Sequence, residues 1–382
     1  MKKVWLWVGI GIVVAIAVVL LIVQPWKAKE PNVIKIGAIL TLSGDAAPYG
    51  QSARNAIELG IKEINNSDLL KGRKISVIYE DDQLDPKTGV NAFMKLTEVD
   101  KVQVVIGPLT SSVALSIAPV ANEKRIVILS PSASSPNLTD AGDYIFRNVA
   151  SDEFETKVMA DYAFDTLKLK KIGIIYVNND FGEGYKTFFT KFFTAKGGDV
   201  PVSEAYEQGT SDFRSQLIKI KSDLVDAIYV IGYKEMGKIL RQAKEIGIKT
   251  IFLSYSAIED PDIIKQAGNA AEGLIYTRQS FDPDDPENVV SKFSSSYRQT
   301  YNIDPDAYAA LSYDSIMILA KAIAEGGFNS EGIKIALYEI KNFPGVTGRT
   351  TFDQNGDVTK SISIKMIKDG KFYYIEKSYF NP

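Results

Sequence analysis

Small hydroxyl side chains follow two of the strands that the sequence predicts. Ser111 and Ser112 come after the apolar run Val102–Ile106, and a Ser-rich turn at 131–136 comes after the next run, Arg125–Ser130. Ser111 and Ser112 also stand at the expected start of a helix, where free backbone N–H groups and the helix dipole favour an anion. Two strand ends of this kind could hold a carboxylate with neutral donors alone. The alternative is that Ser111 only caps a helix and that 131–136 is only a turn.

Histidine and cysteine are both absent from the 382 residues. Their absence excludes a Ser-His-Asp hydrolase, an H-E-x-x-H metalloprotease, a cysteine nucleophile, thiolate metal sites and a disulfide framework. The string 232–238 matches G-x-x-x-x-G-K but lacks the Ser or Thr of a phosphate-binding loop, and 353–357 lacks the final Glu of a calcium loop. We therefore expect neither an enzyme nor a metal or other cofactor.

Length and charge narrow the class of protein further. A chain of 382 residues has room for two ordinary domains. The formal net charge is −3, and four lysines and one glutamate before position 31 sum to +3, so the remainder carries −6. Because phosphate backbones are bound by basic surfaces, we expect no nucleic-acid partner.

The first thirty residues differ in composition from the rest. Val4–Val23 is an uncharged apolar run of 20 residues, about the length that crosses a bilayer as a helix. Lys2 and Lys3 precede it, which places the N-terminus in the cytoplasm and the body outside. The run is longer than the core of a signal peptide and no small-x-small cleavage site follows it. We favour an uncleaved anchor, and the alternative is a cleaved signal with a secreted or periplasmic product.

Beyond Pro31, short β-branched runs alternate with segments of helical periodicity. The expected strands are Val33–Leu40, Lys74–Tyr79, Val102–Ile106, Arg125–Ser130, Lys171–Tyr176, Asp226–Ile231 and Thr250–Leu253, and the expected helices include Gln51–Asn65, Pro86–Glu98 and Val113–Glu123. Such alternation is typical of α/β proteins with parallel sheets covered by helices on both faces. Ligands of these folds bind outside the carboxyl ends of the strands.

Long stretches of the body resemble the leucine/isoleucine/valine-binding protein family, the type I periplasmic solute-binding proteins of ABC transporters. The resemblance begins with IKIGAILTLSGDAAPYGQSARNAIELGIKEIN and continues through GPLTSSVALSIAPVANEKRIVILSPSASSPNLT. KKIGIIYVNNDFGEGY, IGYKEMGKILRQAKEIGIKTIF, AGNAAEGLIYT and ALSYDSIMILAKAI follow in the family's order. The similarity covers nearly all of the chain from about Ile34 onward.

The resemblance implies a fold and its domain boundaries. Two doubly wound α/β lobes with parallel sheets would be joined by three hinge strands, with the ligand in the cleft between the lobes. The crossings would fall near Asn148–Asp152, Thr277–Gln279 and Asp357–Lys360. Residues 1–30 would be the anchor or signal segment, residues 33–149 and 279–358 lobe one, and residues 150–278 and 359–382 lobe two.

The resemblance also implies ligand contacts. Ser111 matches a family serine on the ligand carboxylate, Ser132 a residue that contacts ligand through its backbone, and Ser134 a threonine whose hydroxyl it keeps. Tyr49 matches an aromatic residue of the first lobe. Phe181 replaces a usual tyrosine and lacks its hydroxyl, and Tyr233 lies near an aromatic position of the second lobe.

Ser256 is the main departure from the family pattern. The family has Glu or Asp there, paired with the ligand ammonium, and a buried ammonium without a counter-charge is costly. Either Glu259 or Asp260 turns into the cleft, or the ligand is not an α-amino acid. We rank Glu259 above Asp260, because Pro261 holds Asp260 toward solvent.

These expectations combine into a function. The chain would be an extracytoplasmic, membrane-anchored protein that captures a small carboxylate ligand, a branched-chain or related amino acid, between two closing lobes. It would deliver this ligand to the permease and ATPase subunits of an ABC transporter. The alternatives are a binder of aliphatic or aromatic carboxylates and a sensor ectodomain. Because no signalling domain follows Pro382, we favour transport over sensing.

Overall fold

The computed structural model of the protein describes residues 32–44, 46–279 and 281–380. The described residues from Val33 onward belong to one unit of contacts. The predicted apolar helix Val4–Val23 lies outside the described residues, so the choice between an anchor and a cleaved signal stays a prediction.

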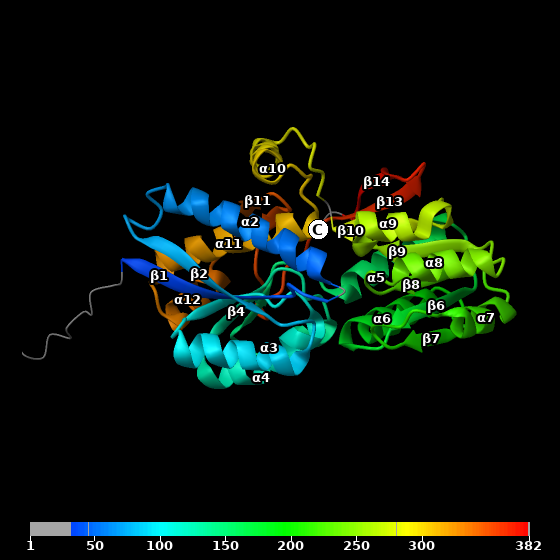
Figure 1. The fold of residues 1–382 in the computed structure, drawn as a ribbon, viewed down its shortest axis with the longest axis horizontal. Helices are drawn as coiled ribbons and strands as arrows, with labels where there is room; N and C mark the ends of the chain where they lie inside the picture. Colours follow the sequence, from blue (N-terminus) through cyan, green and yellow to red (C-terminus); the bar gives the residue numbers. More distant parts are fainter. Residues whose placement is uncertain (1–31, 45, 280, 381–382) are drawn as a thin grey trace, which may run out of the picture. The chain divides into compact units, whose positions relative to one another are not determined.

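A parallel sheet of five strands is built from the first part of the described chain. Its order is β2-β1-β3-β4-β5, and Figure 1 labels β1, β2 and β4 of it. The strands are β1 (Val33–Leu40), β2 (Lys74–Asp81), β3 (Val104–Ile106), β4 (Val127–Ser130) and β5 (Ile145–Arg147). The helices that accompany this sheet are α2 (Ala47–Asn65), α3 (Pro86–Met94), α4 (Ser111–Lys124), α10 (Asn288–Tyr301), α11 (Ala307–Gly326) and α12 (Ser330–Tyr338).

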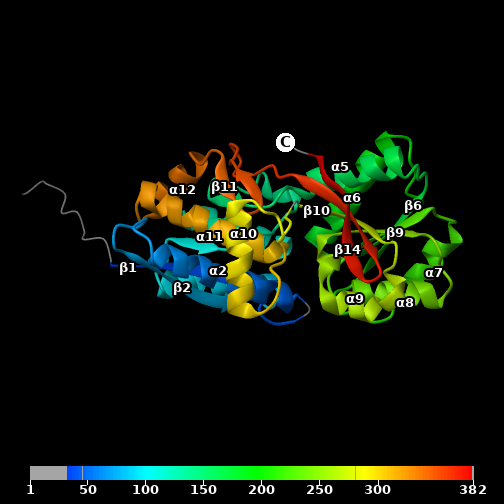
Figure 2. The same ribbon diagram turned by 90° about the horizontal axis from the view of Figure 1, so that it is seen from above.

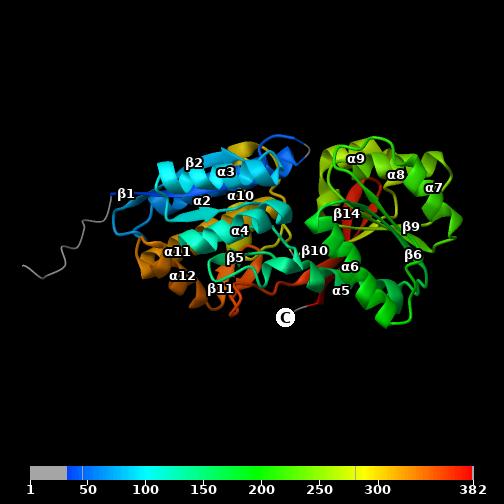
Figure 3. The same ribbon diagram turned by 90° about the horizontal axis from the view of Figure 1, so that it is seen from below.

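Both faces of this sheet are covered at β1, β3 and β4, which explains why these strands are apolar at most positions, whereas the edge strand β2 is half polar. Alternate residues of β1, from Ile34 to Leu40, pack into a core shared with α2, α11 and α12, whereas Ile39 packs into a core shared with α3 and α4. The two helix groups therefore cover opposite faces, and α3 and α4 lie side by side in Figures 1 and 3. Helix α11 is the one described helix with the length and composition to cross a membrane, but here it is a mostly buried core helix.

A second sheet has the order β14-β13-β10-β9-β8-β6-β7. Its parallel part is β6 (Ile172–Val177), β7 (Ser203–Tyr206), β8 (Ala227–Ile231), β9 (Ile251–Tyr255) and β10 (Ile275–Gln279), and β13 (Ile362–Lys368) and β14 (Lys371–Phe380) add antiparallel strands. Its helices are α5 (Asp152–Asp161), α6 (Asp180–Ala195), α7 (Arg214–Ser222), α8 (Met236–Glu245) and α9 (Pro261–Ala267). Figure 2 shows the C-terminal β14 among these elements.

Short elements complete the described chain. A hairpin joins β11 (Phe343–Gly345) and β12 (Gly348–Thr350). Turns of 3-10 helix are η2 (Pro136–Leu138), η4 (Ser256–Glu259) and η5 (Gly268–Ala270), and π-helical turns η1 (Lys95–Val99) and η3 (Tyr162–Thr166) extend α3 and α5.

The chain passes between the two sheets more than once. It leaves β5 of the first sheet for α5 through residues 148–151, and it returns from β10 of the second sheet toward α10 and α11. The segment 351–361 then leads from β12 to β13 of the second sheet. The boundaries of the two lobes at 149/150, 278/279 and 358/359 stay a prediction.

The expected α/β architecture of parallel sheets with helices is confirmed. Strand Val33–Leu40 has the predicted bounds, whereas α2 begins at Ala47 rather than Gln51. Pro48 stands in the first turn of α2, where its fixed φ suits a helix start and its missing N–H is not needed. Helix α4 likewise begins at Ser111, two residues before the predicted start.

Candidate functional site

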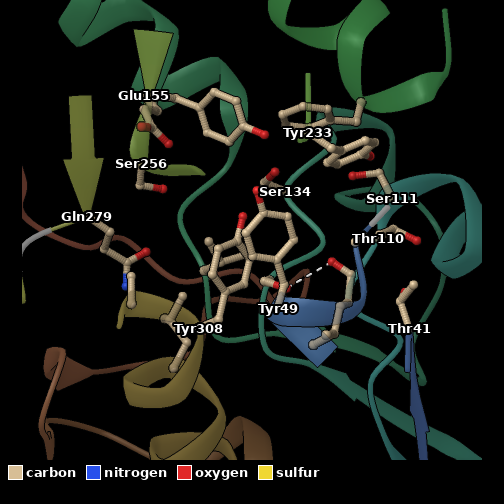
Figure 4. A pocket seen from close by; sticks show the side chains of 18 of the residues that line it. Thr41, Tyr49, Thr110, Ser111, Ser134, Glu155, Tyr233, Ser256, Gln279 and Tyr308 are labelled. Atoms are coloured by element: carbon tan, nitrogen blue, oxygen red, sulfur yellow. Dashed lines mark hydrogen bonds between the residues drawn. The ribbon is translucent and has the colours of Figure 1, made fainter. Parts of the chain in front are cut away.

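A pocket opens where several strands end, and both sheets contribute to it. Its lining follows β1 at Thr41, β3 at Leu109 to Ser111, β4 at Ser132 and Ser134, β8 at Tyr233 and β9 at Ser256. Helices α2, α5, α6 and α11 supply Tyr49, Glu155, Phe181, Tyr185, Ala307, Tyr308 and Leu311. This position is the one expected for α/β folds, at the carboxyl ends of parallel strands. Figure 4 shows these side chains converging.

The serines of the predicted carboxylate site lie together in this lining. Ser111 is the first residue of α4, and the N-cap position is taken by Thr110, whose side chain makes no capping bond. The Ser111 Oγ accepts the backbone N–H of Ser135 at 3.1 Å, so its own hydrogen is left to donate elsewhere. The Thr110 hydroxyl has no hydrogen-bond partner among the described residues. With the helix N-terminus behind them, these neutral donors favour an anion.

A buried arginine fixes the loop that carries Ser134. Arg147 is 1% exposed, and its Nη1 donates to the carbonyl oxygens of Ser134 and Ser135 at 2.9 and 2.8 Å. Its Nε and Nη2 donate to the two carboxylate oxygens of Asp357 at 2.6 and 2.7 Å. Arg147 does not line the pocket. Arg147 pairs with Asp357 and donates to backbone carbonyl oxygens. It therefore connects the serine loop to the segment that leads into β13.

Aromatic rings form much of the remaining wall. Tyr49 and Tyr308 stack with ring centroids 4.6 Å apart, and Phe181 stacks on Tyr233 at 5.8 Å. Phe181 also contacts Tyr185 and Tyr255, at 4.9 and 5.2 Å. The Tyr49 hydroxyl reaches the carbonyl oxygen of Ala257 at 3.5 Å, a long contact between the two sheet groups. The pocket therefore offers flat apolar surface beside the serine hydroxyls.

Seven of the eight residues predicted for the site line this pocket: Tyr49, Ser111, Ser132, Ser134, Phe181, Tyr233 and Ser256. The structure brings them together from segments more than two hundred residues apart in the sequence. Ser132 also donates its hydroxyl to the carbonyl oxygen of Leu109 at 2.9 Å, which ties the two serine-bearing loops to each other. Contact of these residues with a ligand stays a prediction.

The eighth residue, Glu259, lies elsewhere, and its placement corrects the expectation that it turns into the cleft. Its Oε1 accepts hydrogen bonds from Lys365 and from the Tyr276 hydroxyl, both at 2.6 Å, and its Oε2 pairs with Arg278 at 2.6 Å. Burial would raise the pKa of Glu259, but the two cations outweigh this and hold the pKa below its ordinary value. The turn η4 thus directs Glu259 toward β10 and β13, where two buried cations require it.

The lining also includes polar and aromatic residues that the sequence reasoning did not single out: Thr41, Thr110, Glu155, Tyr185, Tyr255, Gln279 and Tyr308. Glu155 is the acidic member of the lining in the described part of the chain. One signal could have indicated it, because Glu155 lies one helical turn after the crossing expected near Asn148–Asp152. Within the described part of the chain, no lysine or arginine stands among the lining residues.

The chain is similar in sequence and fold to known binding proteins. The model of a family described as periplasmic binding protein matches residues 33–371. A curated relative from Brucella suis biovar 1, Leu/Ile/Val-binding protein homolog 1, is 31% identical over 356 residues, which cover 90% of this chain and 94% of the relative.

Two solved structures are similar in fold and in sequence. A leucine-binding protein, LivK, from Thermotoga maritima superposes with a TM-score of 0.84 at 30% identity, covering 89% of this chain and 97% of that one. The branched-chain amino acid transporter substrate-binding protein LivJ from Streptococcus pneumoniae, in complex with isoleucine, has a TM-score of 0.83 at 29% identity, covering 90% and 99%.

Proposed function

The chain belongs to the periplasmic binding protein family, and from this premise we propose that it is the extracytoplasmic solute-binding component of an ABC transporter. It captures a small carboxylate ligand, a branched-chain or related amino acid, between two closing lobes and delivers it to the permease and ATPase subunits. It acts by binding and not as an enzyme. The segment Val4–Val23 holds it at the outer face of the cell membrane.

One observation carries this proposal, namely the pairing of neutral donors with aromatic walls in one pocket. Ser111 and Thr110 stand at the N-terminus of α4, where an anion is favoured without a cationic side chain. Tyr49 and Tyr308 face the same space. A compact ligand with a carboxylate at one end and an apolar body at the other matches both features.

The rings also support a second candidate, a carboxylate without an amino group. Six aromatic residues line the pocket: Tyr49, Phe181, Tyr185, Tyr233, Tyr255 and Tyr308. An aromatic or aliphatic acid would satisfy the serines and bury its body against these rings. The two candidates differ only in whether the ligand brings a positive charge.

Small-molecule mass spectrometry of the purified full-length chain tests the proposal. Ligand released by denaturation should be a small carboxylate, enriched over a control preparation, and calorimetry with the identified compound should return a saturable one-to-one affinity. Recovery of an uncharged sugar or of a cation without a carboxylate would contradict the proposal.

A further inference from the structure

Glu155 is a buried carboxylate that faces the pocket. It lies in the first turn of α5, its residue is 7% exposed, and its side chain is part of the lining. Figure 4 draws Glu155 and Ser256 at one side of the pocket and Ser111 at the other. A carboxylate removed from water in this way needs a partner, because an uncompensated buried charge is costly.

The described protein gives Glu155 no cation. Its Oε1 has no hydrogen-bond partner among the described residues. The hydroxyls of Thr277 from β10 and Tyr185 from α6 lower the pKa of Glu155. Asp152 of the same helix is a second buried acid, and the charge of Glu155 raises its pKa. The negative charge of Glu155 also raises the pKa of the Tyr229 and Tyr308 hydroxyls. The positive charge of Arg147 lowers the pKa of Asp152, and it is not among the groups that shift the pKa of Glu155.

Burial raises the pKa of Glu155, and the hydroxyls of Thr277 and Tyr185 offset this rise only in part. This direction is the one expected for a carboxylate that lacks a positive neighbour. A cation brought by a ligand would supply that neighbour. The described lining residues include no cation, and Ser256 and Gln279, which lie on the same side as Glu155 in Figure 4, are neutral.

The serine site and Glu155 line one pocket, so a single small ligand can contact both. The Ser134 hydroxyl lowers the pKa of the Asp152 carboxyl. Asp152 and Glu155 are three residues apart on α5. Residues with this spacing stand next to each other on one helix face, with Cβ atoms about 5–6 Å apart. An α-amino acid carries its ammonium and carboxylate on neighbouring carbon atoms, so it presents the two groups to adjacent parts of the pocket wall.

We infer that Glu155 is the counter-ion for the ligand's ammonium group, so that the pocket selects α-amino acids by holding the carboxylate at Ser111 and Ser134 and the ammonium at Glu155. This inference rests on the proposed function and adds its ligand class. It also accounts for Ser256, because the positive end of the ligand is met from α5 and no acid is required after β9.

Isothermal titration calorimetry with two matched pairs of probes tests the inference on the full-length chain. The pairs are leucine with 4-methylpentanoate and phenylalanine with 3-phenylpropanoate, where the second compound of each pair lacks the amino group. Glu155→Gln should lower the affinity for the amino acid that binds by roughly 10- to 150-fold, the range for losing a bond to a charged group. The same variant should leave the des-amino compound nearly unchanged.

Glu153→Gln is the matched control, because Glu153 lies on the same helix but its side chain is 47% exposed. It should leave both pairs unchanged. The inference is overturned if Glu155→Gln keeps the affinity for amino acids or weakens both members of a pair equally. If Glu155→Gln does not fold, the wild type decides, since equal affinity for both members of each pair also overturns the inference.

The outcomes separate this inference from the proposed function. A wild-type chain that binds the des-amino acids or benzoate but neither amino acid overturns the role of Glu155 and leaves a carboxylate-binding protein. A wild-type chain that binds none of these five compounds overturns both. A chain that binds an amino acid with the predicted loss in Glu155→Gln supports both.

Discussion

Two glutamates among the elements of the second sheet, Glu259 and Glu155, are largely shielded from water and have opposite surroundings. Glu259 meets Arg278 and Lys365 at 2.6 Å each, and its pKa is held below the ordinary value. Glu155 faces the pocket without a lysine or arginine among the residues that act on it, and burial raises its pKa. At these two positions the chain either supplies the cation itself, as at Glu259, or leaves the position for a ligand to complete, as we infer for Glu155.

The largest expected effect is on folding, at Glu259. Glu259→Gln leaves Arg278 and Lys365 buried without their counter-charge, which should lower the free energy of unfolding by about 3–5 kcal/mol. Guanidinium denaturation of the wild type and the variant measures this difference. Glu155→Gln should not lower the free energy of unfolding, because it removes a charge that has no cationic partner. A larger loss in Glu155→Gln than in Glu259→Gln would reverse the comparison.

The next largest expected effect is on ligand affinity, at the serine proposed to hold the ligand carboxylate. Ser111→Ala removes a hydroxyl donor from the carboxylate site, and we expect a loss of about 1.5–3 kcal/mol in binding free energy for amino and des-amino acids alike. Calorimetry with both members of a probe pair measures it. Ser116→Ala is the control, because the Ser116 hydroxyl on the same helix donates to the carbonyl oxygen of Ser112 at 2.8 Å and does not line the pocket. Equal affinities in all three proteins would place the carboxylate elsewhere.

Ser256 should matter less than Glu155. If the ammonium is met by Glu155, Ser256→Ala costs at most one neutral hydrogen bond, about 0.5–1.5 kcal/mol in leucine affinity. Titration of leucine into Ser256→Ala and Glu155→Gln compares the two positions directly. A greater loss of leucine affinity in Ser256→Ala than in Glu155→Gln would place the ligand ammonium at the turn after β9 instead of at Glu155.

The smallest effect is a difference in pH dependence. The pKa of Glu259 is lowered in the folded protein, so its contribution to stability is present above the ordinary value near 4.3 and is lost as the pH falls through the folded value. The pKa of Glu155 is raised, so it favours the folded state below the ordinary value, and this contribution declines as the pH rises toward the raised one. Unfolding curves of each Gln variant against the wild type, from about pH 3 to 8, should therefore show the stabilisation by Glu259 growing with pH at the acidic end, and the contribution of Glu155 declining with pH above the ordinary value.

Much of the fold could be predicted from the sequence, because parallel strands buried on both faces have an apolar pattern that helices do not share. The strand Val33–Leu40 is an example, with its residues divided between two cores. The serine cluster was also predictable, since Ser111 and Ser134 follow strands whose carboxyl ends lie at one edge of a sheet.

The charge partners could not be predicted in the same way. Glu259 follows Ser256 by three residues, so proximity in sequence suggested that it replaced the missing acid. Its actual partners are Arg278 and Lys365, which are brought to it by the pairing of β10 with β13. For Glu155 the sequence offered only its place one helical turn after an expected crossing, and the position of α5 beside the pocket is what brings it to the serines.

The release of protons on ligand binding tests the central claim most directly. If a ligand ammonium pairs with Glu155, binding should lower its raised pKa and release up to about one proton per ligand. Calorimetry of leucine or phenylalanine in two buffers of different ionisation enthalpy, from about pH 5 to 8, measures this number. We predict release in the wild type and in Glu153→Gln, and none in Glu155→Gln. Proton uptake by the wild type, or equal release in Glu155→Gln, would contradict the account.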